Sequence, residues 1–454
     1  MVAVCVTQPG ERRHAVHTNE RIGLLLTKVP VAANGKSNSL PRRAAATLKG
    51  IGAQFDRRGR QLSHIMLREG WGTLATRARS KLSDWIKPKG FIWHVFPQDV
   101  LNADFTRPAI FAVPAVEDGA PIAINWIVGP AGPGSGGHTT IFRMVNYLQR
   151  IGYDNSVYFY DPYGGDHKYY ESIARSSYGV TCKIGKFGPD MRDAHAVVAT
   201  HWPSAYAMFN IRTAGKRFYF VQDYEPSFYP IGTNSALAES TYRMGFHGLT
   251  AGRWLTEKLA AEFGMESDWF PFGCDTSRYR FNPSSKRNGV AFYARAGTPR
   301  RAVELGLLAL EVFAKRHPEI ELHLFGEDLG MLPFRYTNHG LVSPDKLGDI
   351  YNRCFAGLTL SLTNVSLVPH EMLACGCIPV VNDADHNRMV LDNAHVRYAS
   401  LSPHSLAEAL EAIVAMPNFQ SEAKRAADSV NSTSWDLAGA AIDKALQRAL
   451  KGNA

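Results

Sequence analysis

Residues 361–381 read SLTNVSLVPHEMLACGCIPVV, and this stretch decides the fold class of the chain. A polar loop begins at Ser361, and Pro369 marks the start of a helix because proline fits the first helical turn. The apolar run Ile378–Asn382 then predicts a strand. A loop, a helix and a strand in this order are typical of a parallel sheet wrapped by helices.

The same alternation extends outward from this stretch in both directions. Short β-branched or aromatic runs predict further strands at 122–128, 156–160, 196–200, 218–222, 248–251, 290–294, 321–325 and 356–362. Apolar residues at helical spacing and first-turn prolines predict helices at 139–150, 299–316, 344–354, 369–375, 403–416 and 434–451. We therefore expect an α/β fold with two successive Rossmann-like domains.

Turn-forming residues at 282–288 place the domain boundary between the two blocks of strands. We expect a basic N-terminal extension over residues 1–104, partly disordered or helical. A first Rossmann-like domain would cover residues 105–280 and a second residues 281–454, with the last helix able to cross back to the first domain. Open parallel sheets bind ligands beyond the carboxyl ends of their strands, so two facing sheets predict a deep cleft.

A glycine-rich loop, Gly132–Gly137, follows the strand that ends at Val128 and precedes a helix. Glycine allows close backbone approach, and the free amides of a helix start attract phosphate. The loop also matches the dinucleotide fingerprint G-x-G-x-x-G, with Asp161 at the end of the next strand. A nicotinamide-linked oxidoreductase is therefore a competing interpretation, and so is a structural turn.

The second block contains a strand, a loop with Arg295, Arg300 and Arg301, and a helix. Guanidinium groups at a strand end suit a diphosphate because they form bidentate, charge-assisted hydrogen bonds. A solvated basic loop would carry the same residues. Further along, Glu371 lies in the first turns of the helix after Pro369, where a carboxylate can accept both hydrogens of a ribose diol.

At this point the chain resembles the retaining glycosyltransferases of family 4, which have the GT-B fold. The segments FYARAGTPRR at 292–301, YFVQDYEP at 219–226 and SLTNVSLVPHEMLACGCIPVV at 361–381 are similar to the WsaF-like bacterial rhamnosyltransferases. The resemblance covers roughly residues 107–450, and it is more specific in the second domain than in the first. It implies a nucleotide-sugar donor, dTDP-L-rhamnose.

The resemblance also implies site residues. Donor-binding positions would be Gly136, Gly137, Arg295, Arg300, Arg301, Gly340, Leu341, Val342, Thr363, Asn364, Ser366, Leu367 and Glu371. His201 would take the place of the family's sugar-side histidine, with a core histidine as the alternative. Asp223 and Glu225 would orient acceptor hydroxyls, unless they belong to a surface turn.

One departure from the family pattern is Thr363, because the family has a glutamate there and threonine cannot provide its charge. The sequence Asp383-Ala-Asp385 imitates a metal-binding motif of a different glycosyltransferase fold. Since it follows a strand where the family has a plain loop, we interpret it as structural and expect no metal and no other cofactor.

Positive charge is concentrated at the N-terminus. Residues 1–100 contain 17 Lys and Arg against 6 Asp and Glu, and the remainder contains 33 against 35. Such an extension can contact an anionic membrane surface or an acidic partner, or remain solvated. Nucleic acid is disfavoured because no binding motif accompanies the charge.

The sequence contains six scattered cysteines, which suit reduced thiols. It has no apolar run of membrane-spanning length and no signal-peptide pattern, so we expect a cytoplasmic protein. It could associate peripherally with the inner face of the cell membrane. The expected activity is retaining transfer of a sugar, L-rhamnose, to a polysaccharide or lipid-linked glycan. A non-catalytic glycan-binding or scaffold subunit remains an alternative, with Thr363 as its best support.

Overall fold

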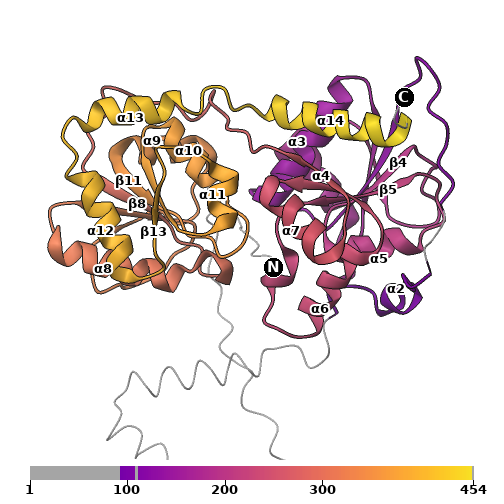
Figure 1. Ribbon diagram of the computed structural model, residues 1–454, viewed down its shortest axis with the longest axis horizontal. Coiled ribbons are helices and arrows are strands. Elements are labelled where there is room, and N and C mark those ends of the chain that lie inside the picture. The colour runs from indigo at the N-terminus through magenta and orange to yellow at the C-terminus, as the bar shows by residue number, and fades with distance from the viewer. Residues whose placement is uncertain (1–92, 108–110, 452–454) are drawn as a thin grey trace, which may run out of the picture. The chain divides into compact units, whose positions relative to one another are not determined.

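The computed structural model describes residues 93–107 and 111–451 of the chain. The interpretation of the basic extension as a membrane-contacting segment therefore lies almost entirely outside the described residues. Within them, two parallel sheets each have their own hydrophobic core, so the predicted α/β class with two Rossmann-like domains is confirmed (Figure 1).

The first sheet has seven parallel strands in the order β3-β2-β1-β4-β5-β6-β7. Its strands are β1 Ala123–Val128, β2 Asp154–Phe159, β3 Lys183–Lys186, β4 Ala196–Ala199, β5 Lys216–Val221, β6 His247–Ala251 and β7 Ser267–Phe270. Its helices are α2 Pro97–Asn102, α3 Gly136–Arg150, α4 His167–Tyr178, α5 Trp202–Asn210, η1 Glu225–Phe228, α6 Thr233–Ser240, η2 Thr241–Arg243 and α7 Arg253–Phe263. The central strands are buried on both faces, as parallel strands require.

The second sheet has six parallel strands in the order β10-β9-β8-β11-β12-β13. Its strands are β8 Gly289–Tyr293, β9 Glu321–Phe325, β10 Thr337–Asn338, β11 Cys354–Leu358, β12 Ile378–Asn382 and β13 Arg397–Ala399. Its helices are η3 Pro299–Arg301, α8 Val303–Arg316, α9 Pro344–Arg353, α10 Val368–Ala374, α11 Asp385–Leu391, α12 Pro403–Val414 and α13 Phe419–Asp428.

The last helix, α14 Trp435–Lys451, packs against α3 and β7 of the first domain (Figure 1). A Cβ atom at Gly439 would lie 2.3 Å from the Tyr147 ring, so only glycine permits this approach of the two helices. Tyr153 donates a hydrogen bond to Asp443, and Arg448 pairs with Asp268. The end of the chain therefore completes the first domain.

Two differences between predicted and observed elements bear on the candidate site. The helix predicted at 299–316 is interrupted at Ala302, whose φ of 45° lies in the left-handed region, so η3 and α8 are separate. The strand predicted at 356–362 ends at Leu358. The amide of Ser361 donates to the Asn382 side chain, 2.8 Å away, instead of continuing the ladder. Both departures lie where the chain approaches the candidate site.

The order of strands reverses once in each sheet, between β1 and β4 and between β8 and β11. Crossover connections leave in opposite directions at such a point, and the carboxyl ends of the strands there form the usual ligand site of an open α/β sheet. Among the described residues, no helix has both the length and the apolarity needed to cross a bilayer.

Candidate functional site

The glycine loop after β1 is fixed by its own domain. The Tyr178 hydroxyl accepts a hydrogen bond from the Ser135 amide at 3.1 Å and donates to the Gly132 carbonyl at 2.5 Å. The amides of Gly136 and Gly137, at the exposed start of α3, have no partner among the described residues. Two free N–H groups at a helix N-terminus form a site for an anion, helped by the helix dipole.

His201 follows β4 on the other side of the same reversal point, and its ring rests against the glycine loop. A Cβ atom at Gly129 would lie 3.0 Å from His201 Nε2, so a larger residue there would require the ring to move by a few tenths of an ångström. His201 Nδ1 is buried and has no hydrogen-bond partner in the part of the chain that the structure describes. Burial lowers the pKa of His201 to about 3, with a smaller contribution from His138, so the ring is neutral near pH 7.

Glu225 lies close to His201 but serves the fold. The side chain is 6% exposed, and its carboxylate accepts hydrogen bonds from the Trp202 amide at 2.7 Å and the Tyr219 hydroxyl at 2.9 Å. Burial raises the pKa of Glu225 to about 7, opposed by these two hydrogen bonds. Because Trp202 begins α5 directly after His201, Glu225 holds the turn that carries the histidine.

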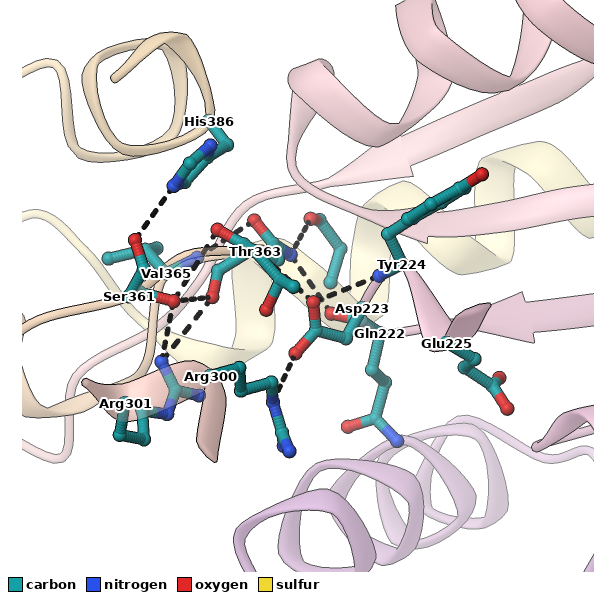
Figure 2. A network of polar contacts seen from close by, with 12 residues as sticks. Gln222, Asp223, Tyr224, Glu225, Arg300, Arg301, Ser361, Thr363, Val365 and His386 are labelled. Atoms are coloured by element: carbon teal, nitrogen blue, oxygen red, sulfur yellow. Dashed lines mark hydrogen bonds and ion pairs between the residues drawn. The ribbon is translucent and has the colours of Figure 1, made fainter. Parts of the chain in front are cut away.

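Asp223, at the end of β5, joins the first domain to the second (Figure 2). Its carboxylate accepts hydrogen bonds from Arg300 Nε at 3.1 Å and from the Asn364 amide at 2.8 Å. The Arg300 guanidinium also lies over the Phe228 ring, 4.1 Å from its centroid. Arg300 is therefore held by an ion pair and a cation–π contact to the first domain.

Asn364 makes a second connection between the domains. Its fully buried side-chain amide donates to the carbonyls of Gln222, at 2.9 Å, and Ala251, at 2.8 Å. These carbonyls mark the carboxyl ends of β5 and β6. Asn364, which is predicted to contact the donor, thus uses its side-chain NH₂ group to hold two strand ends against the loop after β11, while its Oδ1 accepts a hydrogen bond from the Val365 amide at 3.1 Å.

Arg301 and Arg295 have opposite environments. Arg301 is 9% exposed and donates to Ser361 Oγ at 2.8 Å and to the Asn364 carbonyl at 3.4 Å, so it supports the loop from inside. Burial lowers its pKa, opposed by the charge of Asp223. The guanidinium of Arg295 is exposed and has no hydrogen bond or ion pair with any described residue. Arg295 is the arginine of this loop that is free to bind a ligand.

The loop after β11 leads into α10. Thr363 is buried, and its hydroxyl has no partner among the described residues. The amides of Ser366 and Leu367 also make no hydrogen bond within the described chain. They precede the short helix α10, so their N–H groups are available to an acceptor such as an anion.

Glu371 lies in the first turn of α10, between the two domains. Burial raises the pKa of Glu371 to about 7, and this effect is opposed by hydrogen bonding from Tyr279 and by the charge of Arg143. Arg143 belongs to α3 of the first domain. Glu371 therefore lies within electrostatic reach of the helix that begins with Gly136 and Gly137, in addition to its own domain.

The segment Gly340–Val342 precedes α9. Gly340 adopts a φ of 56°, and its amide donates to Asn338 Oδ1 at 2.9 Å. Leu341 is 89% exposed, whereas Val342 packs on the second core. An exposed apolar side chain beside a turn can cover the face of a base.

Sequence reasoning missed several residues that shape the site. His138 Nδ1 lies 2.9 Å from Ser135 Oγ, and His138 Nε2 lies 3.3 Å from the Gly129 carbonyl oxygen. The other missed residues are Tyr178, Phe228 and Arg143, whose contacts are described above. These residues contact partners on other elements, so no local pattern marks them. Among the described residues, no cluster of three or more His, Cys, Asp or Glu side chains could hold a metal ion. Asp383 of the metal-like motif is paired with Arg388.

The fold and the two reversal points define a class of protein. The structure of Anabaena Alr3699/HepE in complex with UDP-glucose has a TM-score of 0.57 to this chain at 14% identity, covering 73% of this chain and 99% of that one. A variant of the Thermobaculum terrenum O-GlcNAc transferase has a TM-score of 0.52 at 12% identity, covering 79% and 75%. The fold is the GT-B fold of glycosyltransferases.

Within this class the chain is WsaF-like. Residues 190–250 match the family model described as WsaF, N-terminal domain, and residues 288–411 match WsaF, C-terminal domain. The O-antigen biosynthesis protein RfbC of Myxococcus xanthus is 31% identical over 382 residues, which cover 80% of this chain. The chain spans 29% of the length of that relative.

Proposed function

We propose that the chain is a glycosyltransferase of polysaccharide synthesis that transfers a sugar from a nucleotide diphosphate donor to a glycan. One observation carries this proposal: Asp223, Arg300 and Asn364 connect the carboxyl end of β5 to the loops after β8 and β11. These contacts bring the carboxyl ends of β5 and β6 in the first domain against the loops that follow β8 and β11 at the reversal point of the second sheet. The resemblance to proteins named for WsaF and for O-antigen biosynthesis supports the same activity.

In this proposal the donor diphosphate binds to the Arg295 guanidinium and to the free amides of Gly136, Gly137, Ser366 and Leu367. These groups stabilise the charge that the leaving diphosphate gains as the glycosidic bond breaks. Glu371 accepts the ribose hydroxyls, and neutral His201 contacts the transferred sugar. Two fixed domains exclude water that would otherwise intercept that sugar.

The finer assignment follows the family resemblance. We propose dTDP-L-rhamnose as the donor, retention of anomeric configuration, a polysaccharide or lipid-linked acceptor and no metal requirement. The anomer of the product, read by NMR, tests retention. Activity in EDTA tests the metal assignment, and loss of turnover that Mg²⁺ restores would contradict it. Calorimetric titration with dTDP, UDP and their sugars identifies the donor, because a true donor also stabilises the fold by mass action.

Glu371 gives the sharpest test of the donor site. Glu371→Ala removes hydrogen bonds to a charged acceptor, and we expect a loss of roughly 1.5–3 kcal/mol in donor binding, about tenfold or more in Kd. Since burial raises the Glu371 pKa to about 7, wild-type affinity should fall as the pH decreases from 8 to 6. Protonation removes the charged acceptor, so the variant should show little of this dependence. Equal donor affinity in both proteins at pH 8 would contradict the ribose assignment.

The nicotinamide alternative has less structural support. Asp161, which would bind the ribose of a dinucleotide, accepts hydrogen bonds from the Tyr163 amide at 2.8 Å and the Gly165 amide at 2.5 Å. Its carboxylate is therefore committed to its own turn. Tight binding of NADH with no binding of nucleotide diphosphates would favour the oxidoreductase. Donor binding without turnover would favour a scaffold subunit.

A further inference from the structure

Aromatic side chains gather beyond the carboxyl ends of β2 and β5, and the donor site described above does not use them. Tyr163 follows β2 and is 55% exposed, and its hydroxyl lies 2.7 Å from His94 Nδ1. The His94 ring centroid is 5.6 Å from that of Tyr229, which follows η1. Phe96, 44% exposed, lies beside Tyr160. We call His94, Phe96, Tyr163 and Tyr229 the aromatic shelf.

The shelf is held in place by hydrogen bonds beneath it. The Asp161 carboxylate fixes the turn that presents Tyr163. The Phe96 amide donates to the Tyr160 hydroxyl at 3.0 Å, and that hydroxyl donates to Asp99 at 2.6 Å. Rings fixed in this way lose little conformational entropy when a ligand binds, which favours affinity.

The shelf lies one layer of side chains from His201. The ring centroids of Tyr160 and His201 are 6.4 Å apart. Trp202, the neighbour of His201 in the chain, donates a hydrogen bond from Nε1 to the Tyr229 hydroxyl at 3.0 Å. A ligand on the shelf would therefore be close to the sugar that His201 contacts.

The chemistry of the shelf favours an uncharged sugar ring. A pyranose has an apolar face of C–H groups and a rim of hydroxyls, which matches aromatic faces flanked by imidazole, phenol and carboxylate groups. Asp99, hydrogen-bonded to Tyr160, and Asp161, hydrogen-bonded to the Tyr163 amide, supply negative charge around these rings, so a phosphate group or an anionic lipid surface would be repelled.

We infer that the aromatic shelf binds a pyranose residue of the acceptor glycan. The identification of this sugar as the acceptor rests on the proposed transferase function. Sugar binding by the shelf can nevertheless be measured without turnover. The shelf then sets which glycans are elongated, whereas the donor is selected by the groups described above.

The kinetic test compares two exposed tyrosines. In Tyr163→Ala, the KM for the acceptor glycan should rise about tenfold with the donor KM unchanged, since one aromatic contact is lost. Tyr163→Phe keeps the ring and should change the acceptor KM by less than about threefold. Tyr169→Ala is the matched control, because Tyr169 is 49% exposed and its ring contacts Tyr170 instead of the shelf. Equal acceptor KM in wild type and Tyr163→Ala would overturn the assignment.

The binding test separates failure of the shelf from failure of the transferase proposal. Saturation-transfer NMR on the full chain would use disaccharides of rhamnose, glucose, mannose and galactose, and calorimetry would measure dTDP and UDP separately. We expect a disaccharide signal that is lost in Tyr163→Ala and kept in Tyr169→Ala. If nucleotide binds but the disaccharide signal is the same in Tyr163→Ala and Tyr169→Ala, or is absent in wild type, the shelf assignment is overturned. The transferase proposal is then unaffected. Disaccharide binding without nucleotide binding leaves the shelf standing and removes the transferase. If the wild-type chain binds phosphatidylglycerol vesicles and Tyr163→Ala abolishes that binding, the ligand of the shelf is a lipid surface and the sugar assignment is overturned.

Discussion

The loops after β1 and β8 occupy equivalent places in the two sheets, yet they use opposite chemistry. The first loop contains no cation, is pinned by Tyr178 and His138 of its own domain, and leaves bare amides at the start of α3. The second loop contains three arginines, of which only Arg295 is free. Arg300 is bound to Asp223 and Phe228, and Arg301 is buried.

This difference shows that charge in a binding loop is not the same as charge available to a ligand. Two of the three guanidinium groups hold the site together, and the third is left for the diphosphate. In the first domain the rigid backbone itself provides the donors. Three substitutions distinguish residues that support the structure of these two loops from residues that bind the ligand.

The largest effect on stability should come from Arg301→Ala in the second loop. Removal of this buried group leaves Ser361 Oγ without its donor and opens a void, so we expect a loss of about 2–4 kcal/mol in the free energy of unfolding. The Asn364 carbonyl keeps the hydrogen bond that Ser361 Oγ donates at 2.6 Å. Urea denaturation measures it. A variant as stable as wild type would show that Arg301 does not support the loop.

The first loop should be most sensitive at Gly129. Gly129→Ala places a methyl group 3.0 Å from His201 Nε2, which displaces the ring by a few tenths of an ångström, and we expect kcat to fall about 3–10-fold, less than the roughly 100-fold cost of a 1 Å misplacement. Gly132→Ala is the control, because a Cβ atom there meets nothing within 4 Å. Comparable activity of the two variants would mean that the position of His201 does not matter for turnover.

The smallest effect on the fold should come from Arg295→Ala. Because this side chain is exposed and unpaired, the unfolding free energy should change by less than about 0.5 kcal/mol. Donor affinity should nevertheless fall by roughly tenfold or more, since a charge-assisted contact to phosphate is lost. Titration calorimetry with the donor measures the second quantity. A destabilised variant with normal donor affinity would reverse the roles assigned to Arg295 and Arg301.

Much of the fold could be predicted from the sequence because parallel strands that are buried on both faces consist of short apolar runs. β12 occupies the predicted residues, 378–382, and β1 begins one residue later than predicted. Short or polar elements such as β3, β10 and β13 were missed, since their burial depends on neighbouring strands. The break at Ala302 has no local signal, because alanine is a good helix former.

The candidate site could be predicted only as a list of residues near strand ends. The sequence places Arg295, Arg300 and Arg301 together but cannot distinguish the free side chain from the paired and the buried ones. Their partners Asp223, Ser361 and Asn364 lie at least 60 residues away in the chain. Likewise the sequence cannot show that the Glu225 carboxylate accepts hydrogen bonds from the Trp202 amide and the Tyr219 hydroxyl. The donor-site and catalytic roles stay predictions for these experiments.

The Asn364 side chain recognises only main-chain carbonyls of the first domain. Such a junction is insensitive to the identity of residues 222 and 251, because every amino acid offers the same acceptor there. The junction requires only that the main-chain carbonyls at the carboxyl ends of β5 and β6 both lie within hydrogen-bonding distance of Asn364 Nδ2. The side chains at 222 and 251 are therefore free to vary without loss of this contact, whereas Asp223 and Phe228, which hold Arg300 through their side chains, are not.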